Sequence, residues 1–222
     1  MSQVPKFGFS AFLKLINANP KPQKRLVRDR FRPSTGGYDF HKSLRQRVQQ
    51  IAFENLGFQE ALASTAAIRK KAERESAIRG LRQFFEWRQK NLGDLSDCES
   101  FVFSSPKGLF KVEFTPNFLI ELNDRRTAVH IWNTRQALSA GLVNASLCMV
   151  ANRHPVEGRP DDFAVLSLQD GRLFKWSDAT KETAAFGEKL LEVLDLDFAN
   201  ARLEFGLPGA IEGERPLEIP RS

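Results

Sequence analysis

The stretch 110-FKVEFTPNFLIELNDRRTAVHIW-132 decides the fold class of this chain. Within it, Phe110, Val112 and Phe114 alternate with polar residues, as they do along a strand that buries one face. The same period of two returns toward the end of the stretch, after the polar turn Asp124–Arg126. The pattern therefore predicts strands for this part of the chain.

Other strands and helices follow in the second half of the chain. Alternating runs predict an antiparallel meander of four strands, over residues 100–104, 109–114, 118–123 and 127–132. We expect an apolar helix over 136–152, a hairpin over 163–168 and 172–176 with its turn at Asp170-Gly171, and a closing helix over 180–204. In this order the elements predict an α+β fold.

The front of the chain has the apolar spacing of helices. Helices are expected over residues 7–16, 39–56 and 64–90, the last of them capped by Ser64 or Thr65. A short basic segment over residues 24–32 lies between the first two helices, and the turn 33–37 ends it.

These elements divide the chain into three expected parts. A basic helical region covers residues 1–60, an α+β domain covers residues 61–205, and a flexible tail covers residues 206–222. The strands and the closing helix carry their own apolar faces. We therefore expect residues 98–205 to fold without the front of the chain.

Positive charge is concentrated in the front. Residues 1–97 hold 19 Lys and Arg against 9 Asp and Glu, whereas residues 98–222 hold 14 against 18. A basic segment attracts polyanions, so DNA or RNA is an expected partner. The alternative is that the cations solubilise the helices or dock on the acidic half of the same chain.

The window from Lys21 to Arg47 is the expected nucleic-acid-binding segment, because it concentrates these cations. Its aromatic residues Phe31, Tyr38 and Phe40 would stack on bases, with burial as the alternative, above all for Phe40. The candidate phosphate contacts are Lys21, Lys24, Arg25, Arg28, Arg30, Arg32, Lys42, Arg45 and Arg47.

The order helix, strand meander, helix, hairpin, helix over residues 65–204 resembles the core of the PD-(D/E)XK nuclease-like superfamily. In that superfamily a Pro-Asp pair and an acid-x-Lys triplet hold a divalent metal ion and activate water. The corresponding positions here are Pro116-Asn117 and His130-Ile131-Trp132, which lack both acids and the lysine. The resemblance therefore implies a degenerate, non-catalytic nucleic-acid-associated protein, with no metal site and no cofactor.

Two other functions stay open. A protein-interaction or regulatory module would use the same amphipathic helices to dock a protein partner. A divergent metal-dependent nuclease would use Glu113, Glu121 or Asp124 as metal ligands. Strand alternation also places Glu121 and His130 on one face of their hairpin, where we expect them as cross-strand neighbours that either stabilise the sheet or serve acid-base chemistry.

The sequence also bears on the cellular compartment. Cys98 and Cys148 lie far apart in the chain, and no disulfide is expected between them. No apolar run reaches about 18 residues, and no secretory signal is visible at the start. A cytoplasmic protein without a membrane partner is therefore expected.

Overall fold

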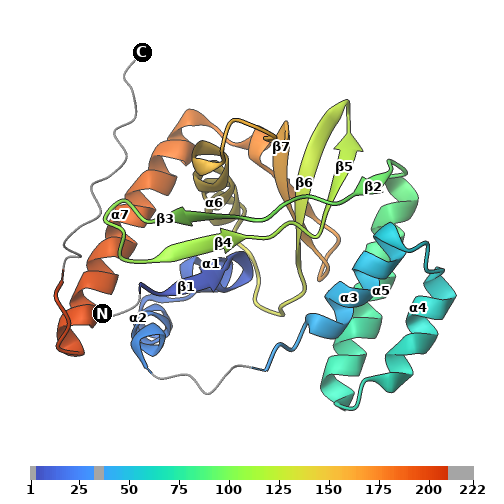
Figure 1. The fold of residues 1–222 in the computed structure, drawn as a ribbon, viewed down its shortest axis with the longest axis horizontal. Coiled ribbons are helices and arrows are strands. Elements are labelled where there is room, and N and C mark those ends of the chain that lie inside the picture. Colours follow the sequence, from blue (N-terminus) through green and yellow to red (C-terminus); the bar gives the residue numbers. More distant parts are fainter. Residues whose placement is uncertain (1–3, 33–37, 210–222) are drawn as a thin grey trace.

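The computed structural model describes residues 4–32 and 38–209, which form an α+β fold with two sheets (Figure 1). The fold class predicted from the sequence is confirmed. Within the described ranges, no helix combines the length and apolar character that crossing a membrane requires.

The smaller sheet has three strands in the order β1-β4-β3. It contains β1 (Lys6–Gly8), β3 (Phe101–Ser104) and β4 (Lys111–Phe114). β3 and β4 pair as an antiparallel hairpin, whereas β1 runs parallel to β4 with Phe7 opposite Val112. The first strand of the chain therefore belongs to the same sheet as strands about one hundred residues later.

The larger sheet has five strands in the order β2-β5-β6-β7-β8. It contains β2 (Leu95–Ser96), β5 (Phe118–Leu122), β6 (Arg125–Trp132), β7 (Asp162–Ser167) and β8 (Leu173–Lys175). β6 and β7 are parallel, and α6 (Ala140–Arg153) connects them. The expected second hairpin is present as β7 and β8, with Gly171 at a φ of +70° between them.

The expected four-strand meander is wrong, because β4 and β5 lie in different sheets. The chain changes sheet at Thr115-Pro116-Asn117. Pro116 has no backbone N–H to extend a ladder, while the Asn117 N–H donates to Val129 O at 2.7 Å and starts the pairing with β6. A proline and an asparagine thus divide the meander into two hairpins.

The turn between β5 and β6 differs by one or two residues from the expected Asp124–Arg126. Leu122 pairs with Arg125, which leaves the two-residue loop Asn123-Asp124. Both loop residues have positive φ, at 51° and 58°. This is the conformation of the favoured two-residue hairpin turn, which Asn and Asp tolerate better than Arg does.

The other helices lie in the front of the chain and at its rear. They are α1 (Phe9–Ile16), α2 (Pro20–Arg28), α3 (Lys42–Phe53), α4 (Phe58–Ser64), α5 (Lys71–Lys90) and α7 (Lys181–Glu204), with 3-10 turns at 29–31, 65–67 and 176–178. The helix expected to start at Ser64 or Thr65 begins instead at Lys71. Ile68, which lies between Thr65 and Lys71, is buried and has an extended backbone, so the helical path is interrupted before α5 starts.

The helices of the front join two different cores. α1 packs beside β1 and β4, and its Phe9 and Phe12 are buried there. α3 and α5 cover the other side of the larger sheet with Leu44, Val48 and Phe84. Figure 1 shows α3, α4 and α5 gathered at one side and α1, α2 and α7 at the other.

Residues 1–60 are therefore not one packing unit, and the expected boundary near residue 60 does not separate the two cores. The expectation that residues 98–205 fold without the front conflicts with the burial of Phe7, Phe9 and Phe12 against that part of the chain. The cause is the long-range pairing of β1 with β4. Of the expected tail, residues 210–222 lie outside the described residues, as does the expected turn 33–37.

Candidate nucleic-acid interface

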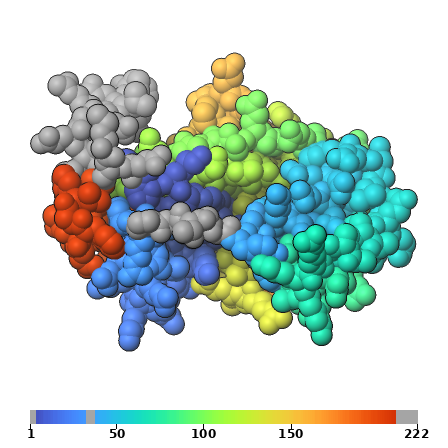
Figure 2. Space-filling model, turned by 60° about the horizontal axis from the view of Figure 1, so that its bottom comes forward, coloured from blue at the N-terminus to red at the C-terminus, as the bar shows by residue number. Residues whose placement is uncertain are grey.

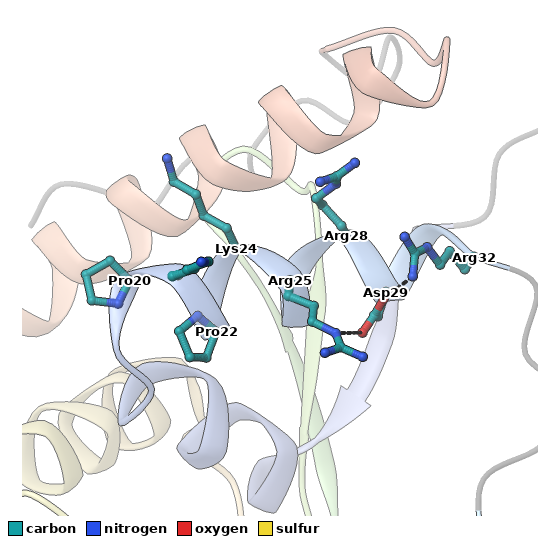
Figure 3. A pocket seen from close by; sticks show the side chains of 8 residues that line it. Pro20, Pro22, Lys24, Arg25, Arg28, Asp29 and Arg32 are labelled. Carbon is teal, nitrogen blue, oxygen red and sulfur yellow. Dashed lines mark hydrogen bonds and ion pairs between the residues drawn. The ribbon is translucent and has the colours of Figure 1, made fainter.

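The cations of α2 form the densest part of the expected interface. Lys21, Lys24, Arg25 and Arg28 are exposed, at the spacing that places side chains along one side of a helix. Val27 is buried and anchors the opposite side of α2 in the first core. An open groove of about 1000 Å³ follows these cations, with Arg32 at its end (Figure 3).

Acidic side chains neutralise part of this charge. Asp29 lies 3.8 Å from Arg25 Nε and 2.9 Å from Arg32 Nη1. Arg28 Nε contacts the Glu204 carboxylate of α7 at 2.7 Å. Acids of α7 and of the turn after α2 therefore neutralise some of these cations. The contact with Glu204 agrees with the alternative that the basic front docks on the acidic half of the chain.

The side chains of the cations of α2 point in different directions. Figure 3 shows Lys24 and Arg28 reaching toward α7, whereas Arg25 meets Asp29 away from it. Burial raises the pKa of the Asp197 carboxyl on α7, and Lys24 acts against that rise. Lys21 has no ion pair among the residues that the structure describes. Lys21, Arg25 and Arg32 thus keep a net positive charge for a partner, because Arg25 and Arg32 share the one carboxylate of Asp29.

Arg30 does not belong to the exposed set. Its guanidinium lies 4.7 Å from the centre of the Phe7 ring, half-buried against the first core. Burial lowers the pKa of Arg30, while Asp29 acts in the opposite direction. Arg30 is therefore less accessible to a phosphate than the exposed cations of α2.

The last three candidate cations lie on α3, away from α2. Arg47 donates to Ser64 O at 2.6 Å and to Ser43 O at 2.8 Å, so it ties α3 to the end of α4. Arg45 is paired with Asp39, whereas Lys42 is at the start of α3. Figure 2 shows α2 and α3 on the same face of the molecule, in separate places.

The three aromatic residues of the window have internal contacts. Phe31 packs against Phe198, with ring centres 5.9 Å apart. Phe40 is half-buried beside His41. Tyr38 is 56% exposed, yet its hydroxyl donates to the buried Glu73 and Lys70 lies over its ring. Of these three residues, Tyr38 alone is largely exposed, with Lys70 over one face of its ring.

The positions that resemble a nuclease motif stabilise the sheet instead. The Ile131 N–H donates to Asn117 Oδ1 at 2.7 Å, so the Asn117 amide bridges the start of β5 to β6. The indole of Trp132 is buried and donates to Gln136 O at 3.2 Å. Neither side chain is directed toward solvent, where a substrate would be reached.

His130 has a different partner from the one expected. Glu121 is exposed and lies opposite Arg126, and His130 lies further along β6. The two side chains are therefore not cross-strand neighbours. His130 instead faces the first core, where its Nδ1 lies 2.9 Å from Thr115 O and its Nε2 lies 2.8 Å from Ser10 Oγ.

The three carboxylates of the nuclease hypothesis do not meet at one point. Glu113 belongs to the smaller sheet and pairs with Lys6 at 3.2 Å. Glu121 and Asp124 line a groove at the edge of the larger sheet. Among the described residues, no three His, Cys, Asp or Glu side chains are grouped so that they could hold a metal ion.

Sequence reasoning missed a second place where polar side chains converge, at the carboxyl end of β6. His41, Arg79 and Thr134 meet there from three separate parts of the chain. The only local signal was the polar pair Asn133-Thr134 directly after a buried strand.

Comparison with models of known protein families found no match, and comparison with curated protein sequences found none.

Proposed function

We propose that this chain is a non-catalytic nucleic-acid-associated protein that contacts the sugar-phosphate backbone through α2. The observation that carries the proposal is the row of exposed cations beside an open groove on one helix. Such contacts attract phosphates without reading base sequence. DNA and RNA are both candidate ligands.

The dimensions of α2 suit this role. A helix of nine residues is about 13 Å long, which is the length of several phosphates along one strand. Lys21, Arg25 and Arg32 keep a net positive charge for a partner, although Asp29, which pairs with both arginines, also lines the groove. We expect weak, salt-sensitive binding, because that acid opposes part of the attraction.

The non-catalytic part of the proposal rests on the degenerate motif. Asn117 and Trp132 are occupied in hydrogen bonds to the backbone, and Glu113 lies in another sheet from Glu121. The proposed likeness to the PD-(D/E)XK nuclease-like core rests on the chain order of α5, strands, α6, hairpin and α7 alone, since the strands of its expected meander lie in two sheets. A nuclease without converging carboxylates lacks the charge needed to hold its metal ion.

A protein-interaction module is the second candidate, and one observation favours it. α7 exposes a row of apolar side chains, which are Phe186, Val193, Leu196 and Leu203. Exposed apolar surface along one helix is typical of a docking face for a protein.

Titration of labelled DNA and RNA at low and moderate salt tests the proposal. The variant Lys21→Gln, Arg25→Gln, Arg32→Gln is expected to weaken binding. On double-stranded DNA, the slope of log affinity against log salt should become shallower by about 0.9 for each phosphate that the variant no longer neutralises. In Mg²⁺ or Mn²⁺ the nucleic acid should stay intact.

A matched control removes the same charge elsewhere. Lys90, Arg82 and Arg125 are exposed and lie outside α2, so their change to Gln should leave most of the affinity and the salt slope unchanged. Absence of binding at low salt, or an equal decrease of affinity in both triple variants, would contradict the proposal and favour the protein-interaction module.

A further inference from the structure

A separate cavity of about 360 Å³ lies at the carboxyl end of β6. Its walls come from the segment before α3, from α5 and from the loop after β6, so it shares no lining residue with the groove of α2. The volume is at the small end of the range for ligand sites. The end of a strand that runs parallel to its neighbour is also a common position for such sites.

Two arginines of this cavity have no ion pair with an acid among the described residues. Arg79 Nε is buried without a hydrogen-bond acceptor among the described residues. Arg135 is exposed and forms no ion pair within the same part of the chain. The one acid in the lining, Glu75, lies 3.9 Å from Lys71. Two positive charges that no acid neutralises favour an anion at the cavity that they line.

Other polar groups at the cavity are only loosely engaged. His41 Nε2 lies 3.5 Å from Thr134 Oγ1, and His41 Nδ1 lies 3.5 Å from Asn133 Nδ2. Both distances are at the upper limit for a hydrogen bond. The Thr134 hydroxyl and the imidazole are therefore available to a ligand without breaking a strong hydrogen bond.

The loop that carries Thr134 and Arg135 is held in place by Asn133. The Asn133 amide is buried and donates to Ser76 Oγ at 3.1 Å, and Gln169 donates to Asn133 O at 3.1 Å. Gly80 permits this approach, because a Cβ there would lie 3.0 Å from Asn133 Oδ1. The site is thus built on α5 and β6.

The geometry points to a binding site for a phosphate monoester, with its phosphate held by Arg79 and Arg135 and its organic body against Phe40. Two guanidinium groups from the lining of one cavity match the charge and the acceptors of a phosphate. Phe40 and Ala72 supply an apolar wall for a ring. The source of the phosphate monoester is either a free mononucleotide or the 5′-phosphate end of a nucleic-acid strand.

Calorimetric titration of the full chain tests this site with inorganic phosphate, adenosine 5′-monophosphate and unphosphorylated adenosine. The monophosphate should bind, inorganic phosphate should compete with it, and adenosine should bind much more weakly. Arg79→Gln and Arg135→Gln should each weaken monophosphate binding by about tenfold or more. Arg135 is exposed, so its variant keeps the fold even if the Arg79 variant is less stable.

Arg82→Gln is the matched control, since Arg82 lies on α5 outside the cavity lining. It should bind the monophosphate like the unchanged chain, and so should the triple variant of α2. A short oligonucleotide with and without a 5′-phosphate separates the two sources. No binding of monophosphate, equal binding of adenosine, or binding unaffected by both arginine changes would overturn the inference, whereas oligonucleotide binding through α2 would stand independently.

Discussion

At the scale of single residues, His130 illustrates how burial fixes a protonation state. Phe9 and Phe114 pack around its ring. A carbonyl oxygen only accepts hydrogen bonds, so the proton lies on Nδ1 and is donated to Thr115 O, while Nε2 accepts the Ser10 hydroxyl. Burial lowers the pKa of His130 from 6.5 to about 4, with the Thr115 hydrogen bond acting against the shift. The folded protein thus requires a neutral imidazole.

This requirement predicts an acid-sensitive stability. Between pH 6.5 and about 4, the unfolded chain protonates His130 and the folded chain does not, so the free energy of unfolding decreases as the pH falls. At about 1.4 kcal/mol for each pH unit, the total decrease is roughly 3 kcal/mol. Urea unfolding at several pH values measures it, and His130→Gln should show a flatter dependence. An unchanged slope in that variant would contradict the assignment.

At the scale of elements, the packing of α6 against α7 depends on one glycine. A Cβ on Gly187 of α7 would lie 2.9 Å from the carbonyl oxygen of Ala145 on α6. That oxygen belongs to the backbone of a buried helix and has little freedom to move. The close approach of the two helices therefore needs a residue without a side chain.

Gly187→Ala is expected to lower the free energy of unfolding by about 1–3 kcal/mol, because the two helices must separate. Alanine alone would favour the helix by up to about 1 kcal/mol, so the steric effect must exceed the gain in propensity. Gly141→Ala on α6 is the control, since nothing lies within 4 Å of a Cβ there. Urea denaturation of both variants measures which effect is larger. Equal free energies of unfolding for the two variants would show that α7 shifts to accommodate the added methyl group and would contradict the prediction.

At the scale of the whole molecule, the front of the chain completes the core of the rear. The rings of Phe7, Phe110 and Phe198 are stacked, with centres 5.7 and 6.1 Å from the Phe7 ring. Phe12 adds a further buried ring, edge-on to Phe103. Residues near the two ends of the described chain thus share one aromatic cluster.

A fragment of residues 61–209 is therefore expected not to fold cooperatively. It lacks Phe7, Phe9 and Phe12 from the first core and Leu44 from the second. Removal of a buried Phe or Leu side chain costs about 2–5 kcal/mol, and several such changes exceed the roughly 5–15 kcal/mol that stabilises an ordinary domain. Thermal melting followed by circular dichroism measures this, with residues 1–209 as the control. A sharp transition in the shorter fragment would contradict the expectation.

The sequence by itself determined the class and most of the elements of this protein. Alternation at Val112 and Phe114 marks a strand, and spacing at Leu44 and Val48 marks a helix, because both periods follow from the local geometry of the backbone. The turn at Gly171 could be predicted as well, because a turn also depends on local backbone geometry. The cations of α2 were also visible as a basic segment, since charge is a property of the residues themselves, but the helix Pro20–Arg28 that carries them was not predicted.

Only the tertiary structure decided which segments meet. β1 pairs with a strand far along the chain, Arg47 donates a hydrogen bond to Ser64 O, and Arg79 and Arg135 line the same cavity. Such contacts depend on how separately formed apolar faces pack together. A local pattern records that a face is apolar or charged, but the partner that covers it is set by long-range packing.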